Sequence, residues 1–158
     1  MKPLGAQIKR RLYLPLIIGS LASLGCAAQP AGSAPAVPAE SANEALNCLL
    51  ASNCVNSLDD LSSLPPLRFA GSAEDGKAIL MTTLAAFPEA RIVANAPLLV
   101  EAVFTTTLGF RDQVLFRIDA PGQRIDFRSS SNFGLYDFGK NRSRMKEFTA
   151  RFEKESGR

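Results

Sequence analysis

The 158-residue sequence contains no histidine, and this absence excludes several kinds of catalytic site. Without an imidazole, neither a Ser-His-Asp triad nor a Cys-His pair can form. Cysteine is also scarce, with three in the chain, so a closed zinc site with four nitrogen or sulfur ligands lacks its ligands. No phosphate-binding P-loop or dinucleotide-binding fingerprint occurs. The sequence therefore predicts no metal site and no cofactor, and it favours a protein that is not an enzyme.

Without its N-terminal segment, the chain has no excess of basic residues. The formal net charge is +3, but four of the 18 basic residues lie in the first 25 residues, and removing that segment leaves 14 basic against 15 acidic residues. A nearly neutral chain lacks the strongly basic balance that is typical of nucleic-acid binding. We therefore expect no nucleic-acid partner.

Residues 1–25 have the pattern of a signal peptide. Basic residues precede an apolar stretch from Leu12 to Leu24, and small residues follow it. The apolar stretch is shorter than the roughly 20 residues that a membrane-spanning helix needs, so an uncleaved anchor is the less favoured alternative. The segment KRRLYL also resembles a twin-arginine export signal, which leaves the export route open. We expect an exported protein.

The stretch SLGCAA at the end of this segment resembles the lipobox of bacterial lipoproteins, in which Cys26 is lipidated and becomes the N-terminus. Ser23 stands where that pattern usually has leucine, so ordinary cleavage near Ala27 or Ala28 is the alternative. Residues 27–43 are rich in Ala, Pro and Ser and are predicted to be a linker. The predicted organisation is a signal peptide (1–25), a lipid-attachment cysteine with its linker (26–45) and one globular domain (46–158). The predicted location is the periplasmic side of the bacterial cell envelope, anchored to a membrane, or otherwise secreted or periplasmic.

The remaining cysteines, Cys48 and Cys54, form a pair if Cys26 carries lipid. An exported domain meets an oxidising compartment, where such a pair closes a disulfide. The five intervening residues, LLASN, would form a short stapled loop. We predict this disulfide, with free thiols as the alternative.

Residue patterns in the domain predict two helices and five strands. The segment LRFAG is a strand candidate, and Ser72 followed by Asp75 is a capping box for a helix with Leu80, Leu84 and Phe87 on one face. Further strands are expected at residues 90–95 and 98–107, then at 113–119 and 124–130, and a final helix from about Phe138 to Glu155. The predicted core includes Leu98, Val100, Ala102, Phe104, Val114, Phe116, Ile118, Ile125, Phe127, Met145, Phe148 and Phe152.

The turn APGQ fixes the register of the last two strands. If Pro121 and Gly122 are its central residues, Asp119 faces Arg124 and Arg117 faces Asp126, on the solvent side. The order β-α-β-β-β-β-α predicts an α+β fold, a two-layer sandwich in which an antiparallel sheet of about five strands carries two helices on one face. The other face of the sheet is expected to be partly exposed.

Residues 128–145, RSSSNFGLYDFGKNRSRM, surround one aspartate, Asp137, with arginines, serines and glycines. Arg142 and Arg144 fall in the first turns of the final helix, where the helix dipole disfavours cations. We therefore expect a negative group nearby, and Asp137 is the obvious candidate.

Two signatures make the domain resemble a known family. The first is NCLLASNCVNS, residues 47–57, and the second is a pattern of Arg-Ser-x-Ser, Gly, Asp, Gly and Asn-Arg-x-Arg. The second comprises Arg128, Ser129, Ser131, Gly134, Asp137, Gly139, Asn141, Arg142 and Arg144. Over about residues 46–155 the chain resembles the bacterial and plastid family known as domain of unknown function 1499. The resemblance implies no established activity.

The cluster has two interpretations. In the structural one, which we favour, Asp137 caps the helix and accepts a forked hydrogen bond from Arg128 or Arg142, while the serines satisfy loop backbone groups. In the other, the cluster and the amides at the helix start bind a phosphate or carboxylate. The residues of this predicted anion site are Arg128, Ser129, Ser131, Asp137, Asn141, Arg142 and Arg144.

These patterns predict a non-enzymatic envelope lipoprotein domain. It would bind an envelope protein or a small anionic or amphiphilic ligand, through the Arg/Ser loop or the exposed sheet face. One alternative is a hydrolase or transferase that uses Asp137 or the serines at 129–131, and another is a purely structural envelope protein.

Overall fold

The computed structural model of the chain describes residues 44–58 and 63–158. The predicted signal peptide, Cys26 and the predicted linker as far as residue 43 lie outside these residues. Within the described residues, no helix is both long and apolar enough to cross a membrane.

The described residues form strands and helices in an order close to the predicted one. In chain order they are β1 (Cys54–Asn56), β2 (Leu67–Arg68), α2 (Ala73–Ala85), β3 (Ala90–Ala96), β4 (Leu99–Thr105), β5 (Arg111–Asp119), β6 (Arg124–Ser131) and α3 (Lys140–Glu155).

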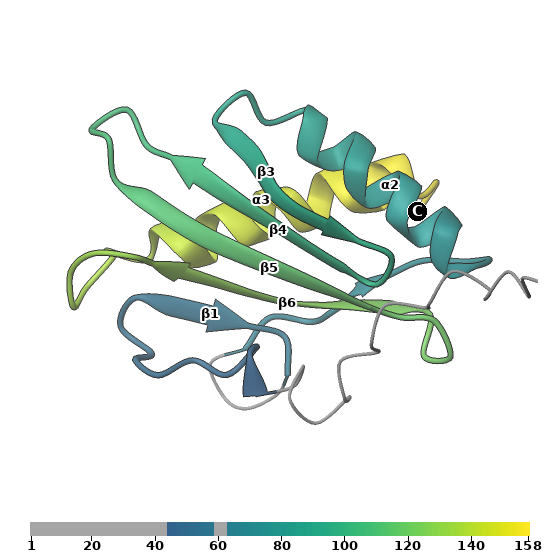
Figure 1. Cartoon of the computed structure of the whole chain (residues 1–158), viewed down its shortest axis with the longest axis horizontal. Helices are drawn as coiled ribbons and strands as arrows, with labels where there is room; N and C mark the ends of the chain where they lie inside the picture. The colour runs from purple at the N-terminus through teal and green to yellow at the C-terminus, as the bar shows by residue number, and fades with distance from the viewer. Residues whose placement is uncertain (1–43, 59–62) are drawn as a thin grey trace, which may run out of the picture. The chain divides into compact units, whose positions relative to one another are not determined.

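The strands form one antiparallel sheet of six strands in the described part of the chain, with the order β1-β6-β5-β4-β3. β2 pairs with β6 near Ile125, while β1 pairs with β6 from Arg128 to Ser130, so two short strands share one edge of β6. Both helices lie on one face of the sheet (Figure 1). The predicted two-layer α+β fold is confirmed, and β1 is one strand more than predicted. A strand of three residues is too short to show an alternating apolar pattern in the sequence.

The capping box of α2 is confirmed. The hydroxyl of Ser72 accepts a hydrogen bond from the backbone N–H of Asp75 at 3.2 Å, and the Asp75 carboxylate accepts one from the backbone N–H of Ser72 at 2.8 Å. Each group thereby satisfies an N–H that the helix start leaves without a partner. Leu80 and Leu84 turn into the core, and Phe87, just past the helix end, is buried beside them.

The core lies between the sheet and the two helices. Phe87 stacks on Phe148 of α3 with ring centroids 5.4 Å apart, and Phe116 of β5 lies 5.0 Å from the same ring. The predicted core residues are buried with one exception. Leu98 is 49% exposed, because it belongs to the β3–β4 turn and precedes the first residue of β4.

The β5–β6 hairpin has the predicted register, in which Arg117 pairs with Asp126 and Asp119 with Arg124. The expectation that these pairs face solvent is wrong for Asp126, whose side chain is 1% exposed. Ser57, in the segment that follows β1, donates its hydroxyl to the Asp126 carboxylate at 3.5 Å. A segment distant in sequence therefore covers this carboxylate.

The helix α3 begins two residues later than predicted. Phe138 has φ 54, and Gly139, which caps the helix, has φ 73, so both backbones are left-handed rather than helical. Glycine adopts this conformation without a steric penalty. The turn is thus set by Gly139, and Phe138 is left 90% exposed beside it.

Candidate functional site

Most of the Arg/Ser cluster lies in a buried polar network centred on Asn141, the second residue of α3. The Asn141 side chain accepts a hydrogen bond from the hydroxyl of Ser129 at 2.6 Å. Its amide donates to the hydroxyl of Ser131 at 3.0 Å and to the backbone carbonyl of Asn53 at 3.2 Å. Asn141 and Ser129 are fully buried. One side chain therefore ties together β6, α3 and the residue that precedes β1.

Asp137 completes the start of α3. Its carboxylate accepts hydrogen bonds from the backbone N–H of Gly139 at 2.9 Å and of Asn141 at 2.8 Å. It also accepts the Asn141 side-chain amide at 2.8 Å. Gly139 has no side chain to cap the helix, so Asp137 supplies this function from two residues earlier. The predicted capping by Asp137 is present.

Arg144 meets a different carboxylate from the one that the sequence suggested. It lies against Asp112 of β5, at 2.5 Å, and also donates to Asn141 at 3.0 Å. The Ser131 hydroxyl donates to the second oxygen of Asp112 at 2.6 Å. The serines thus satisfy side chains of this network, whereas we expected them to satisfy loop backbone groups. The negative group that we inferred from the helix dipole exists, but Asp112 provides it.

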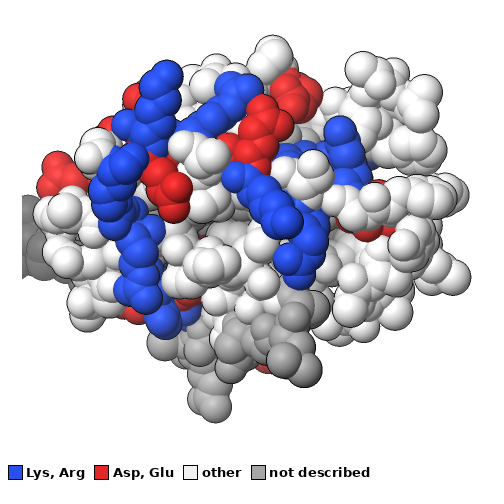
Figure 2. Space-filling view, turned by 180° about the vertical axis from the view of Figure 1, so that it is seen from behind, with Lys and Arg blue, Asp and Glu red and all other residues white. Residues whose placement is uncertain are grey.

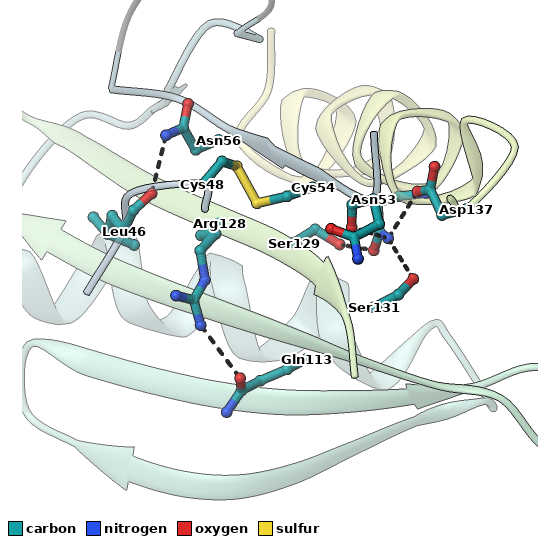
Figure 3. The surroundings of a disulfide bond; sticks show 11 residues. Leu46, Cys48, Asn53, Cys54, Asn56, Gln113, Arg128, Ser129, Ser131 and Asp137 are labelled. Atoms are coloured by element: carbon teal, nitrogen blue, oxygen red, sulfur yellow. Dashed lines mark hydrogen bonds between the residues drawn. A yellow bond between two sulfur atoms is a disulfide. The ribbon is translucent and has the colours of Figure 1, made fainter. Parts of the chain in front are cut away.

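Arg128 is separated from this network, because its neighbours Ser129 and Ser131 point to the helix side of the sheet and it points to the other. We call the sheet surface opposite the helices the open face. Arg128 extends across it from β6 and donates to the side-chain oxygen of Gln113 on β5 at 3.3 Å (Figure 3). Gln113 in turn donates to Glu101 on β4 at 2.6 Å. Of the two donors predicted for Asp137, Arg128 or Arg142, Arg128 is therefore not the one that bonds to it.

The charge of Arg128 is balanced differently from that of its two neighbours on the open face, Arg117 and Arg124. Arg117 lies 2.6 Å from Asp126, and Arg124 lies 3.1 Å from Asp119. Among the described residues, Arg128 forms no ion pair. A guanidinium whose protein partner is a neutral amide retains donors for an anion.

A pocket of about 240 Å³ lies beside Arg128 and opens to solvent. The Cys48–Cys54 disulfide, predicted from the sequence and present in the structure, forms the base of the loop that bounds it (Figure 3). The lining residues are Asn47, Leu49, Leu50, Asn53, Cys54, Arg128, Ser130 and Ser131. Arg128 and Ser131 are the members of the predicted anion site that reach this pocket.

The sequence-based prediction of the anion site missed the contribution of Asn47, Leu49 and Leu50. One signal was available, since two adjacent leucines inside a loop of five residues between cysteines cannot both be buried easily. Leu49 is 95% exposed. Arg142, also in the predicted site, is half-buried on α3. No group of His, Cys, Asp or Glu that could hold a metal ion occurs among residues 44–58 and 63–158.

Comparison with known proteins gave one family match. The family described as "Protein of unknown function (DUF1499)" matches residues 45–152, which includes both the disulfide loop and the Asn141 network. No curated protein and no solved structure matches the chain.

Proposed function

This chain belongs to the family of proteins of unknown function DUF1499, and we propose its function from the geometry of its own residues. The domain is a non-enzymatic binding module of the cell envelope. It takes a small anionic group, or the anionic head of an amphiphile, in the pocket beside the disulfide. Arg128 is the residue that holds the anion.

The observation that carries this proposal is the environment of Arg128. Two neighbouring arginines on the same face are matched by aspartates, whereas the Arg128 side chain has, within residues 44–58 and 63–158, only a hydrogen bond of 3.3 Å to the amide of Gln113. The planar guanidinium presents paired N–H donors that match a carboxylate or a phosphate. Its place in the lining of a solvent-open pocket makes these donors accessible.

The size and lining of the pocket indicate the class of ligand. Its volume of about 240 Å³ is below the range of about 300–1,000 Å³ that is usual for whole drug-sized ligands. A phosphate, a carboxylate or a lipid head group fits that volume better. Leu49 and Leu50 lie at the rim, 95% and 46% exposed, and offer an apolar surface to a short chain attached to such a group.

The other residues of the predicted anion site are less suited to binding a ligand than this pocket is. Asp137 accepts three hydrogen bonds, and the Ser129 and Ser131 hydroxyls donate to Asn141 and Asp112. Groups already used in this way are poorly placed to attack or protonate a substrate. The same arrangement therefore favours a binding module over a hydrolase or transferase built on these residues.

The proposed place in the cell envelope rests on the sequence. The basic and apolar pattern of residues 1–25, followed by Cys26, supports export and lipid anchoring. A disulfide at Cys48–Cys54 fits an oxidising compartment.

Thermal unfolding of the full chain with a panel of anions tests the proposal. The panel contains inorganic phosphate, acetate, glycerol phosphate and a short-chain phosphatidic acid. A ligand at 100 times its Kd adds about 2.7 kcal/mol to the free energy of unfolding. We expect at least one member to raise the Tm of the wild type.

Arg128→Gln should abolish this rise, because the neutral side chain keeps a hydrogen-bond partner for Gln113 but has no charge. The matched control is Arg91→Gln. Arg91 is exposed on β3 opposite Val103, on the same open face but distant from the pocket lining. Equal stabilisation of Arg128→Gln and the wild type, or no stabilisation by any member of the panel, would contradict the proposal.

A further inference from the structure

The end of the sheet at which β4 and β6 finish carries large apolar side chains that point into solvent. We define the apolar end by six residues in two loops. They are Leu108 and Phe110 in the β4–β5 turn, and Phe133, Leu135, Tyr136 and Phe138 between β6 and α3. All are at least 50% exposed, and Phe138 is 90% exposed. Exposed apolar residues that cluster in this way mark interaction surfaces, whereas single ones need no explanation.

Hydrogen bonds hold the two loops in place. The backbone N–H of Asn132 donates to the carbonyl of Arg111 at 3.1 Å, which joins the β6–α3 loop to the start of β5. The Asn53 side chain donates to the carbonyl of Gly134 at 2.7 Å, and the N–H of Asp137 donates to the carbonyl of Ser52 at 3.2 Å. The apolar side chains therefore point outward from loops that hydrogen bonds hold in a fixed position.

Aromatic residues dominate this surface. Phe110, Phe133, Tyr136 and Phe138 provide four rings, and those of Tyr136 and Phe138 meet edge to face with centroids 5.0 Å apart. Tyrosine combines an apolar ring with a polar hydroxyl, and such residues prefer the boundary between lipid and water.

The charges around the apolar end are basic. Lys140 and Arg142 begin α3, whose first turn contains no acidic residue, and Arg111 is exposed at the start of β5. Of the nearby carboxylates, Asp112 is paired with Arg144, and Asp137 caps the helix. Figure 2 views the helix side. The end with these loops, on its right, is mostly uncharged, and Lys and Arg lie over the helices with Asp and Glu among them.

We propose that the apolar end docks onto the surface of an anionic lipid bilayer. The aromatic and leucine side chains enter the boundary between head groups and acyl chains, and Arg111, Lys140 and Arg142 face the lipid phosphates. An apolar surface bordered by basic side chains is the combination that binds peripheral proteins to anionic membranes. This contact uses the folded domain itself and is independent of both the lipid proposed on Cys26 and the pocket beside Arg128.

The absence of tryptophan from the sequence permits a site-specific test. Phe133→Trp places a single reporter in the apolar end of the full chain. Leu98→Trp is the matched control, because Leu98 is 49% exposed in the β3–β4 turn, at the opposite end of β4. The apolar N-terminal segment is identical in both variants, so it cannot produce a difference between them.

Each variant is mixed with vesicles of phosphatidylcholine alone or with added phosphatidylglycerol. We expect the emission of Phe133→Trp to shift to shorter wavelength with the anionic vesicles, and brominated acyl chains to quench it, while Leu98→Trp is unaffected. Adding Lys140→Glu to Phe133→Trp should weaken vesicle affinity about tenfold, and high salt should weaken it further.

Two results would overturn the proposal. The first is an unshifted Phe133→Trp spectrum with both kinds of vesicle, which would show that the apolar end does not enter a bilayer. The second is an equal shift for Phe133→Trp and Leu98→Trp, which would show unspecific adsorption of the chain. A circular dichroism spectrum matching that of the wild type confirms that each variant is folded.

Discussion

Arg144 and Asp112 form a buried ion pair, with 2.5 Å between Nη2 and Oδ2 and side chains that are 5% and 4% exposed. Arg144 also lies over the ring of Phe104, 5.0 Å from its centroid. The pair joins the first half of α3 to the start of β5. Its burial makes it sensitive to the loss of either partner, because a lone charge in the interior has neither water nor a counter-ion.

Arg144→Met should lower the free energy of unfolding by about 3–5 kcal/mol, since it leaves Asp112 charged and buried without its partner. Urea titration measures the change. Glu147→Gln is the control, because Glu147 forms an exposed pair with Arg151 that should contribute less than about 0.5 kcal/mol. The double variant Asp112→Asn/Arg144→Met should recover part of the loss. If Arg144→Met unfolded at the same urea concentration as the wild type, this pair would not stabilise the fold.

Asn141→Ala distinguishes the buried network from helix propensity. Alanine is a better helix former than asparagine by less than about 0.7 kcal/mol, so propensity alone predicts a small gain in stability. The loss of hydrogen bonds to Ser129, Ser131 and Asn53 predicts a decrease of at least about 2 kcal/mol instead. Thermal unfolding shows whether the substitution raises or lowers the stability. Asn95→Ala is the control, because Asn95 is exposed on β3.

The Cys48–Cys54 disulfide should stabilise the domain by about 2 kcal/mol, since its sequence separation of 6 closes a short loop in the unfolded chain. The double substitution Cys48→Ser/Cys54→Ser should lower the Tm but leave a folded core, because the apolar side chains of α2 and α3 pack on the sheet and only the start of α3 is hydrogen-bonded to the loop. Hydrogen exchange should increase in residues 47–53 and remain low in β5. Global loss of protection would contradict this expectation.

Asp75 should make α2 sensitive to acid. The hydrogen bond from the backbone N–H of Ser72, and then that from its hydroxyl, lower the pKa of Asp75 below its ordinary value of 3.8. Because the folded-state pKa is lowered, the stabilisation is fully present above the ordinary pKa and disappears as the pH falls through the lowered value. Asp75→Asn should therefore have a lower Tm than the wild type at neutral pH, and the difference should vanish in strong acid. A difference that persists there would show that charge is not its cause.

Lipidation of Cys26 predicts that the full chain incorporates a labelled fatty acid in a bacterial host. Cys26→Ser should abolish the label, because the serine hydroxyl does not replace the thiol in this modification. Incorporation that survives Cys26→Ser would exclude lipid attachment at this residue. Cys48→Ser, which alters another cysteine, should keep the label and serves as the control.

The apolar alternation was sufficient to predict most of the fold. Val114, Phe116 and Ile118 of β5, and Met145, Phe148 and Phe152 of α3, are buried where their periodicity places them. The capping box at Ser72 and the hairpin register at Asp119 and Arg124 were also predicted, because both depend on residues close in sequence. Contacts between distant segments were harder to predict from the sequence, as the pairing of β1 and the burial of Asp126 show.

The candidate site was predicted as one cluster, and the structure divides it into two. Successive residues of a strand point to opposite faces, so Arg128 and Ser130 line the open pocket while Ser129 joins the buried network. The partner of Arg144 was assigned to Asp137, near in sequence, whereas the antiparallel pairing of β5 with β6 brings Asp112 opposite Ser131. No pattern in the residues around Asp112 indicated this contact.

By itself the sequence determined the two-layer α+β fold, the pairing of Cys48 with Cys54 and the family signatures, because local periodicity, turn chemistry and residue identity encode them. Only the tertiary structure decided which charged side chains form ion pairs that hold the fold and which remain available to bind a ligand. That distinction depends on burial and on partners from distant strands. It separates Arg144, locked against Asp112, from Arg128, whose only hydrogen-bond acceptor among the described residues is the amide of Gln113.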